Sequence, residues 1–125
     1  MKYSIELPEN KIKQVLRRHL VVQGWNPGII RKTQRGFVIV ATRGDEKWII
    51  AIKGEESPNF VESFVITLGS TLLSMEDSKT KHSIALPDTT PFRNLWHRLP
   101  FLAKQRAGVT ALFVNKENVV NETEQ

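Results

Sequence analysis

The sequence of 125 residues contains no cysteine. This absence excludes disulfide bonds and every site that uses a thiolate, and it suits a reducing compartment, so we expect a cytoplasmic protein. The sequence also has no run of about 18 apolar residues and no apolar segment at its start, which argues against a membrane partner and against export. Its length fits one domain with one hydrophobic core.

Common catalytic signatures are missing as well. The sequence has no GxxxxGK[ST] loop, no GxGxxG turn after a strand and no GxSxG elbow, so it gives no support to nucleotide-dependent or α/β-hydrolase chemistry. The three histidines, His19, His82 and His97, are too scattered to form a metal-ligand motif. Lys81 and His82 could assist a phosphate, but polar residues commonly begin a strand. We therefore expect no metal site and no cofactor.

Acidic residues are scarce in the first half of the chain. The formal net charge is +5, but residues 1–53 carry eleven lysines and arginines against four acids, a net +7, whereas residues 54–125 carry seven against nine, a net −2. A basic surface attracts the phosphate backbone of DNA or RNA, because binding releases condensed counterions. The cations expected to form this footprint, if the fold brings them together, are Arg17, Arg18, Arg31, Lys32, Arg35 and Arg43.

Apolar periodicity predicts the main elements. Ile12, Leu16 and Leu20 recur one helical turn apart and predict a helix over residues 8–23. Two β-branched runs joined by a turn at Gly44 predict a hairpin, and their nearly continuous apolar character favours a sheet that is covered on both faces. The other expected elements are a short strand at 29–33, a helix from Ser57 over about 18 residues, a strand at 82–87, a helix from Thr90 that is interrupted near Pro100, and a strand at 109–115.

The expected order is therefore α-β-β-β-α-β-α-β. A connection from strand to helix to strand strongly favours a right-handed parallel crossover, so the strands that begin near residues 47, 82 and 109 should lie in one mixed sheet with helices on its faces. The fold class is a three-layer α/β domain that spans residues 1–115. Residues 116–125 are polar and are expected to form a frayed tail.

Several short motifs resemble those of one known group of proteins. They read GW at 24–25, GFVIVATRGDEKWIIAIKG at 36–54, LGSTLLSM at 68–75, HSIALPD at 82–88, LWHRLP at 95–100 and ALFV at 111–114. In these motifs the sequence resembles small prokaryotic members of the PD-(D/E)xK nuclease superfamily. The resemblance covers nearly the whole chain, and it implies the restriction-endonuclease-like fold with a mixed central sheet.

The chemistry of this superfamily, as the resemblance implies it, needs two carboxylates and a lysine on the hairpin. The carboxylates hold Mg²⁺ against the scissile phosphate, and the lysine places the attacking water or stabilises developing charge. The two acid positions are occupied here by Val38 and Ala51, and only Lys53 remains. A Glu or Gln that commonly follows LG is replaced by Ser70, a poor metal ligand. The resemblance therefore implies a degenerate catalytic site.

A displaced acid is the alternative to a degenerate site. If the strand continues beyond Lys53, alternation places Glu55 on the side shared by Lys53 and Ala51. Glu55 is then the best candidate for a migrated carboxylate, with Mg²⁺ as the implied cofactor, although a solvated charge at a strand end is the more ordinary role. Two carboxylates within reach of Lys53 would favour this interpretation. Lys53 itself could also extend into solvent or hold a phosphate.

Three functions remain open from the sequence. The leading interpretation is a catalytically inactive nuclease-like domain that binds nucleic acid, either DNA or RNA, or a partner in prokaryotic DNA processing or defence. The second is an active Mg²⁺-dependent endonuclease that uses Lys53 and Glu55. The third is a protein-interaction module, such as a homodimer, in which Val38 and Ala51 fill the former site.

Overall fold

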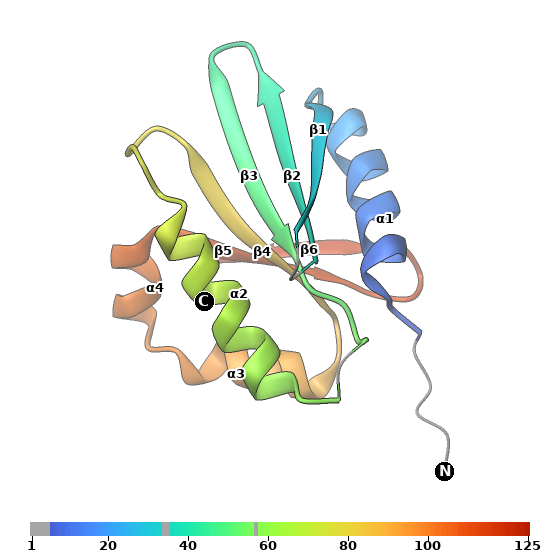
Figure 1. Cartoon of the computed structure of the whole chain (residues 1–125), viewed down its shortest axis with the longest axis vertical. Helices are drawn as coiled ribbons and strands as arrows, with labels where there is room; N and C mark the ends of the chain where they lie inside the picture. The colour runs from blue at the N-terminus through green and yellow to red at the C-terminus, as the bar shows by residue number, and fades with distance from the viewer. Residues whose placement is uncertain (1–5, 34–35, 57) are drawn as a thin grey trace.

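Figure 1 shows the computed structural model, which describes residues 6–33, 36–56 and 58–125. The described chain contains four helices and six strands. In chain order these are α1 (Glu9–Val22), β1 (Asn26–Thr33), β2 (Gly36–Arg43), β3 (Glu46–Ile52), α2 (Phe60–Leu73), β4 (Lys81–Pro87), α3 (Thr90–Arg98), α4 (Phe101–Ala107), β5 (Val109–Val114) and β6 (Val120–Thr123).

All six strands form one mixed sheet in the order β1-β2-β3-β4-β5-β6. The first three strands pair antiparallel, β3, β4 and β5 pair parallel, and β6 returns antiparallel to β5. The parallel pairing of the three strands that begin near residues 47, 82 and 109 confirms the sequence prediction. It follows from the two crossovers through helices, because parallel neighbours need a long connection.

Helix α1 covers one face of the sheet, here called the α1 face (Figure 1). Its apolar stripe, Ile12, Leu16 and Leu20, is fully buried. Strand β3 meets this stripe with alternate residues, among them Trp48 and Ile50, which are 3 % and 0 % exposed. Each large apolar side chain that is removed from water in this way stabilises the fold by roughly 1.5–3 kcal/mol.

Helices α2 and α3 cover the opposite face, here called the α2 face (Figure 1). Phe64 of α2 and the aromatic pair Phe92 and Trp96 of α3 pack there against Ile84 and Phe113 of the sheet. Helices therefore lie on both faces, and the domain has three layers. The nearly continuous apolar strands are explained by this double cover.

The observed helix boundaries agree with those expected from the sequence in all but one place. Helix α2 begins at Phe60 rather than at Ser57, because Asn59 caps it by accepting the Glu62 N–H at 3.2 Å, and Ser57 lies outside the described residues. The interruption near Pro100 divides α3 from α4, since proline has no N–H to continue the helix. No helix in the described part of the chain combines the length and apolar character needed to cross a bilayer.

The C-terminal segment is ordered into the sheet, so the expectation of a frayed tail is wrong. Val120–Thr123 form β6 on the outer edge of β5. Glu122 accepts a hydrogen bond from Thr110 Oγ1 at 2.8 Å and forms an ion pair with Lys81, whose Nζ is 2.7 Å away. A four-residue strand with one apolar residue, Val120, carries little apolar signal, but an edge strand needs only backbone pairing on one side.

Candidate functional site

A cavity of about 680 Å³ opens on the α2 face, between α2 and the hairpin. Its volume lies within the range of roughly 300–1,000 Å³ that is typical of small-molecule sites. Apolar side chains of β2 and β3 form its floor, hydroxyl groups of α2 form its roof, and charged side chains lie around its rim. The floor includes Val38, Val40, Ile49 and Ala51, the roof Thr67, Ser70, Thr71 and Ser74, and the rim Arg31, Lys47 and Asp77.

The three positions at which the resemblance implies polar catalytic groups meet in this cavity. Val38 and Ala51 are directly paired between β2 and β3, so their Cβ atoms lie about 4.5–5.5 Å apart. Ser70 joins them from α2 on the other wall, and all three are half-buried. The fold thus brings the three positions to one place, and two of them carry aliphatic side chains.

These residues do not fit a Mg²⁺ ion, which binds through hard oxygen ligands and usually one or two carboxylates. Val38 and Ala51 offer no donor atom. On the rim, Asp77 accepts hydrogen bonds from the backbone N–H groups of Thr80 and Lys79 at 2.8 Å each, and these bonds hold its pKa below the usual value. Within the ranges that the structure describes, no three His, Asp or Glu side chains are grouped so that they could hold a metal.

Lys53 lies outside the cavity lining. Strand β3 ends at Ile52, and the Lys53 amine turns to Glu9 at the start of α1, with Nζ 3.3 Å from Oε1. The two side chains are 15 % and 14 % exposed. The prediction that alternation keeps Lys53 beside Ala51 is therefore wrong for the amine, because the strand ends before it.

The Glu9 carboxyl is partly withdrawn from water, and burial raises its pKa. The Glu56 carboxylate raises this pKa further, whereas the Lys53 amine and the Gly54 N–H lower it. A Cβ on Gly54 would collide with the Glu9 backbone nitrogen, so only glycine permits this close approach. Glu56 in turn accepts the Glu9 N–H at 2.8 Å, at the helix N-terminus where negative charge is favourable. The loop after β3 therefore holds the start of α1.

Glu55, the proposed displaced acid, has a partner of its own. Its Oε1 accepts the Leu7 N–H at 2.9 Å, and its own N–H donates to the Leu7 carbonyl at 3.1 Å. Burial raises the pKa of Glu55 although the Leu7 N–H lowers it, and the charges of Glu6 and Glu56 add to the rise. These contacts give Glu55 a structural role that fastens the segment before α1 to the end of β3.

His82 is one of the buried polar residues of the cavity lining. It is the second residue of β4, pairs in register with Ile49, and is only 3 % exposed. Its Nδ1 has no hydrogen-bond partner within the described part of the chain. Burial lowers the pKa of His82, Asp77 opposes this shift and Lys47 adds to it, so the surroundings favour the neutral imidazole. The cavity lining thus includes a histidine whose Nδ1 is unsatisfied among the described residues.

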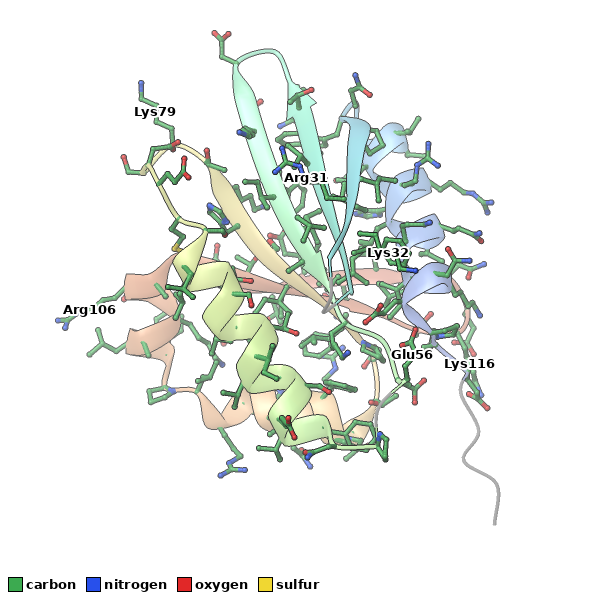
Figure 2. The ribbon with its side chains drawn as sticks, viewed as in Figure 1. Arg31, Lys32, Glu56, Lys79, Arg106 and Lys116 are labelled. Atoms are coloured by element: carbon green, nitrogen blue, oxygen red, sulfur yellow. The ribbon has the colours of Figure 1, made fainter. Side chains whose placement is uncertain are left out.

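The cations predicted to bind phosphate are divided between the two faces. Arg31 pairs with Val38 and lines the cavity, whereas the next residue, Lys32, lies on the α1 side. There the Lys32 and Lys13 amines are 5.9 and 4.3 Å from the ring centroid of Phe37. Figure 2 shows Arg31 over the hairpin and Lys32 toward α1. This division follows from strand alternation, which the sequence footprint ignored.

The remaining cations of the footprint differ in their surroundings. Arg17 and Arg18 are exposed on α1. Arg43 stacks 4.3 Å from the centroid of Trp25 and pairs with Glu46 at 3.0 Å, so its charge is already shared. Arg35 lies outside the described residues. We define the α1 basic surface as Lys13, Arg17, Arg18 and Lys32.

Glu9 was not expected at this site from the sequence, and His82 was considered only beside Lys81, as a residue that could assist a phosphate. The spacing of Glu9 suggests only a local helical pair with Lys13, and nothing local indicates its contact with Lys53, 44 residues away. His82 carries a weak signal: a polar residue in a strand that is covered on both faces must find a partner or remain unsatisfied.

Comparison with known proteins shows that solved structures share this fold. Neither a protein-family model nor a curated protein matches the chain. The solved structures that match include an XisH family protein from Nostoc punctiforme PCC 73102, with a TM-score of 0.60 and 22 % identity. They also include an fdxN element excision controlling factor protein from Anabaena variabilis, with a TM-score of 0.59 and 19 % identity. Each alignment covers 88 % of this chain and 95 % of the other. At this identity the likeness establishes a shared α/β fold.

Proposed function

We propose that this chain is a catalytically inactive, nuclease-like domain of restriction-endonuclease-like fold, which binds DNA through the α1 basic surface. The observation that carries this proposal is the convergence of Val38, Ala51 and Ser70 on one cavity. A metal site of the superfamily would be built from these positions, and their side chains here supply no carboxylate. A domain that keeps the shape of a nuclease without its metal ligands suits binding without cleavage.

The solved neighbour from Anabaena variabilis supports a link to DNA rather than RNA. That protein is described as a controlling factor of fdxN element excision. Excision of an element is a DNA-processing event, and a controlling factor need not cut DNA itself. For this chain we therefore propose a role in prokaryotic DNA processing in which it binds the duplex or a partner without cleaving.

The α1 basic surface has the properties that backbone binding requires. No ion pair between described residues involves its four cations. Their charge is therefore available to phosphates, and each phosphate contact releases condensed counterions. Binding of this kind does not depend on base sequence and weakens as salt concentration rises.

Cleavage is tested with supercoiled plasmid DNA in the presence of Mg²⁺ or Mn²⁺. We expect no nicking above that of a Lys53→Ala variant prepared in parallel. Metal-dependent nicking that disappears in Lys53→Ala would overturn the proposal and establish the active endonuclease, with Glu9 or Glu55 as its acid.

Binding is tested by fluorescence anisotropy of a labelled duplex over a series of salt concentrations. The Arg17→Gln/Arg18→Gln variant should bind more weakly, and its slope of log K against log salt should fall in magnitude by up to about 2. Arg98→Gln/Arg106→Gln is the matched control, because Arg106 lies on α4, far from α1 (Figure 2). Equal losses in both variants, or an affinity that ignores salt, would contradict the assignment of this surface.

A protein-interaction module is the second candidate, favoured by the outer face of α2. Val61, Val65 and Leu72 lie on this helix at helical spacing and are 54 %, 59 % and 44 % exposed, next to Leu73 at 87 %. Clustered exposed apolar side chains mark interaction surfaces. Light scattering should then show a dimer that Val65→Glu converts to a monomer. A wild-type monomer at every concentration would count against self-association.

A further inference from the structure

We infer that the cavity on the α2 face binds one nucleoside monophosphate unit, either a free nucleotide or the terminal nucleotide of a DNA strand. The inference rests on the proposed function, because it names a ligand for the cavity that the missing carboxylates leave open. It is carried by three independent features of the cavity: an unsatisfied buried imidazole, a roof of hydrogen-bond acceptors, and an apolar floor that ends at an arginine.

The unsatisfied imidazole belongs to His82. Its side chain is 97 % buried, it lines the cavity, and Nδ1 has no partner among the described residues. A buried polar atom without a hydrogen bond is costly, so such atoms in native proteins usually meet a ligand or an ordered water. A neutral imidazole offers one donor and one acceptor nitrogen, which suits the mixed donors and acceptors on the edge of a nucleobase.

The roof presents acceptors rather than donors. Thr67 Oγ1 donates to the Ser63 carbonyl at 2.8 Å, Thr71 Oγ1 to the Thr67 carbonyl at 2.9 Å, and Ser74 Oγ to the Thr71 carbonyl at 2.8 Å. The hydroxyl protons are thus used inside α2, while the oxygens retain lone pairs. A ligand that satisfies them must bring N–H or O–H groups, as amino groups of bases and hydroxyl groups of sugars do.

The floor is apolar and ends at a cation. Val38, Ile49 and Ala51 are half-buried and project from neighbouring strands, which forms a flat aliphatic surface for a planar ring. Arg31 lies in register with Val38 at the β1 edge of this floor, is exposed, and takes part in no ion pair between described residues. A guanidinium in this position can bind a phosphate through two parallel hydrogen bonds.

The spacing of these features matches one nucleotide. His82 is on β4 and Arg31 is on β1, three strand spacings or about 14 Å apart between backbones. The two side chains and one nucleotide placed between them together span this distance. The edge of the base then lies at His82, the plane of the base lies over the floor, and the phosphate lies at Arg31. Inorganic phosphate would leave the floor and His82 unused, and an aliphatic ligand would leave the roof and Arg31 unused.

The inference is tested by titrating the full chain with each of the four deoxynucleoside monophosphates, and separately with inorganic phosphate, by calorimetry. At least one nucleotide should bind saturably, and its addition should move the ¹⁵N resonances of the His82 imidazole. Affinity should fall at least tenfold in His82→Phe and in Arg31→Gln, whereas His97→Gln, which changes an exposed histidine on α3, should bind as the wild type does. Arg31 is exposed, so its variant decides the question even if His82→Phe fails to fold.

The outcomes separate this inference from the proposed function. Duplex binding without nucleotide binding would overturn the inference and leave the proposed function in place. Nucleotide binding without any DNA binding would support the cavity as a free-nucleotide site and remove the proposed function. Equal affinity for phosphate and nucleotide, or affinity unchanged in both variants, would overturn the inference. Where nucleotide binds, its displacement by a duplex with phosphorylated ends, but not by a closed hairpin of the same sequence, assigns the ligand to a strand end.

Discussion

The two faces of the sheet are packed to different degrees, although they share the same strands. On the α1 face, the helix lies along the hairpin and its apolar stripe is fully buried. On the α2 face, α2 meets the sheet mainly at β3 and β4, so β2, the strand next to β3, remains partly open and contributes to the cavity floor. Successive residues of β3 therefore lie on opposite faces of the sheet: Ile50 is buried in the core of the α1 face, and Ile49 lines the cavity floor on the α2 face.

This difference separates stability from recognition within one sheet. The α1 face combines a filled core with the segment from Leu7 to Glu9, which Glu55 and Glu56 fasten to the end of β3. The α2 face keeps half-buried apolar residues and a histidine whose Nδ1 has no partner among the described residues, and these stabilise the fold less. Substitutions on the two faces should therefore have different consequences.

The largest contrast should appear between two adjacent residues of β3. Ile50→Ala removes a fully buried side chain on the α1 face and should lower the free energy of unfolding by about 2–5 kcal/mol. Ile49→Ala acts on a half-buried side chain and should cost less than about half of that. Urea unfolding of both variants measures the difference. Equal costs would mean that the cavity is closed in solution.

Metal binding should appear on the α2 face once the implied carboxylates are supplied. Val38→Asp/Ala51→Glu places two acids at directly paired positions and should create a Mn²⁺ site of roughly millimolar affinity, about 4 kcal/mol of binding free energy. Calorimetry measures this, with Val38→Asn/Ala51→Gln as a control of the same size without charge. If the acidic variant binds no metal while remaining folded, these two positions are not equivalent to the acids of the superfamily.

The ion pair between Glu9 and Lys53 at the start of α1 should be stronger than the exposed pair between Arg43 and Glu46 on the hairpin. A double-mutant cycle of Glu9→Gln and Lys53→Met should give a coupling energy of about 1–3 kcal/mol, because both groups are largely shielded from water. The matched cycle on Arg43 and Glu46, whose side chains are 44 % and 60 % exposed, should give at most about 1 kcal/mol. Similar values in urea unfolding would show that the Glu9–Lys53 pair is solvated.

The smallest expected effect is a pH dependence that involves the cavity histidine. Burial holds the folded-state pKa of His82 below its ordinary value of 6.5, so the unfolded chain takes up its proton first as pH falls. Stability should therefore decrease as pH falls below about 6.5, until the folded-state pKa is reached. His82→Phe should lose less stability over this range. Glu9 and Glu55 act in the opposite direction, because their pKa values are raised, but they are common to both proteins and cancel in the comparison.

The architecture was predictable where local patterns decide it. The apolar stripe of α1, the turn at Gly44 and the crossovers between parallel strands follow from periodicity, turn chemistry and handedness. The meeting of Val38, Ala51 and Ser70 was implied by the resemblance, and the structure places all three around one cavity. These features depend on backbone topology, which the sequence pattern constrains strongly.

The features that were not predictable depend on side-chain reach and on edges. A lysine at the end of a strand can turn to any acid within several ångströms, and the acid that Lys53 meets is 44 residues away in the sequence. The division of Arg31 from Lys32, by contrast, was predictable from alternation along the strand expected at 29–33, which the footprint did not apply. Strand β6 is held by backbone pairing with β5, so it needs few apolar residues and gives no apolar pattern from which a strand could be predicted.

Strand β6 also determines how the sheet ends. Without it, the outer edge of the sheet would be β5, whose residues Val109–Val114 are almost all apolar and would present unpaired backbone groups to other molecules. Such an edge is a template for aggregation, whereas a short polar strand is a poor one. At the opposite edge, β1 carries Arg31 and Lys32, and charges on an edge strand also discourage pairing between molecules. Both ends of the sheet therefore resist growth into a larger β-assembly, and β6 protects the β5 edge from pairing with strands of other molecules.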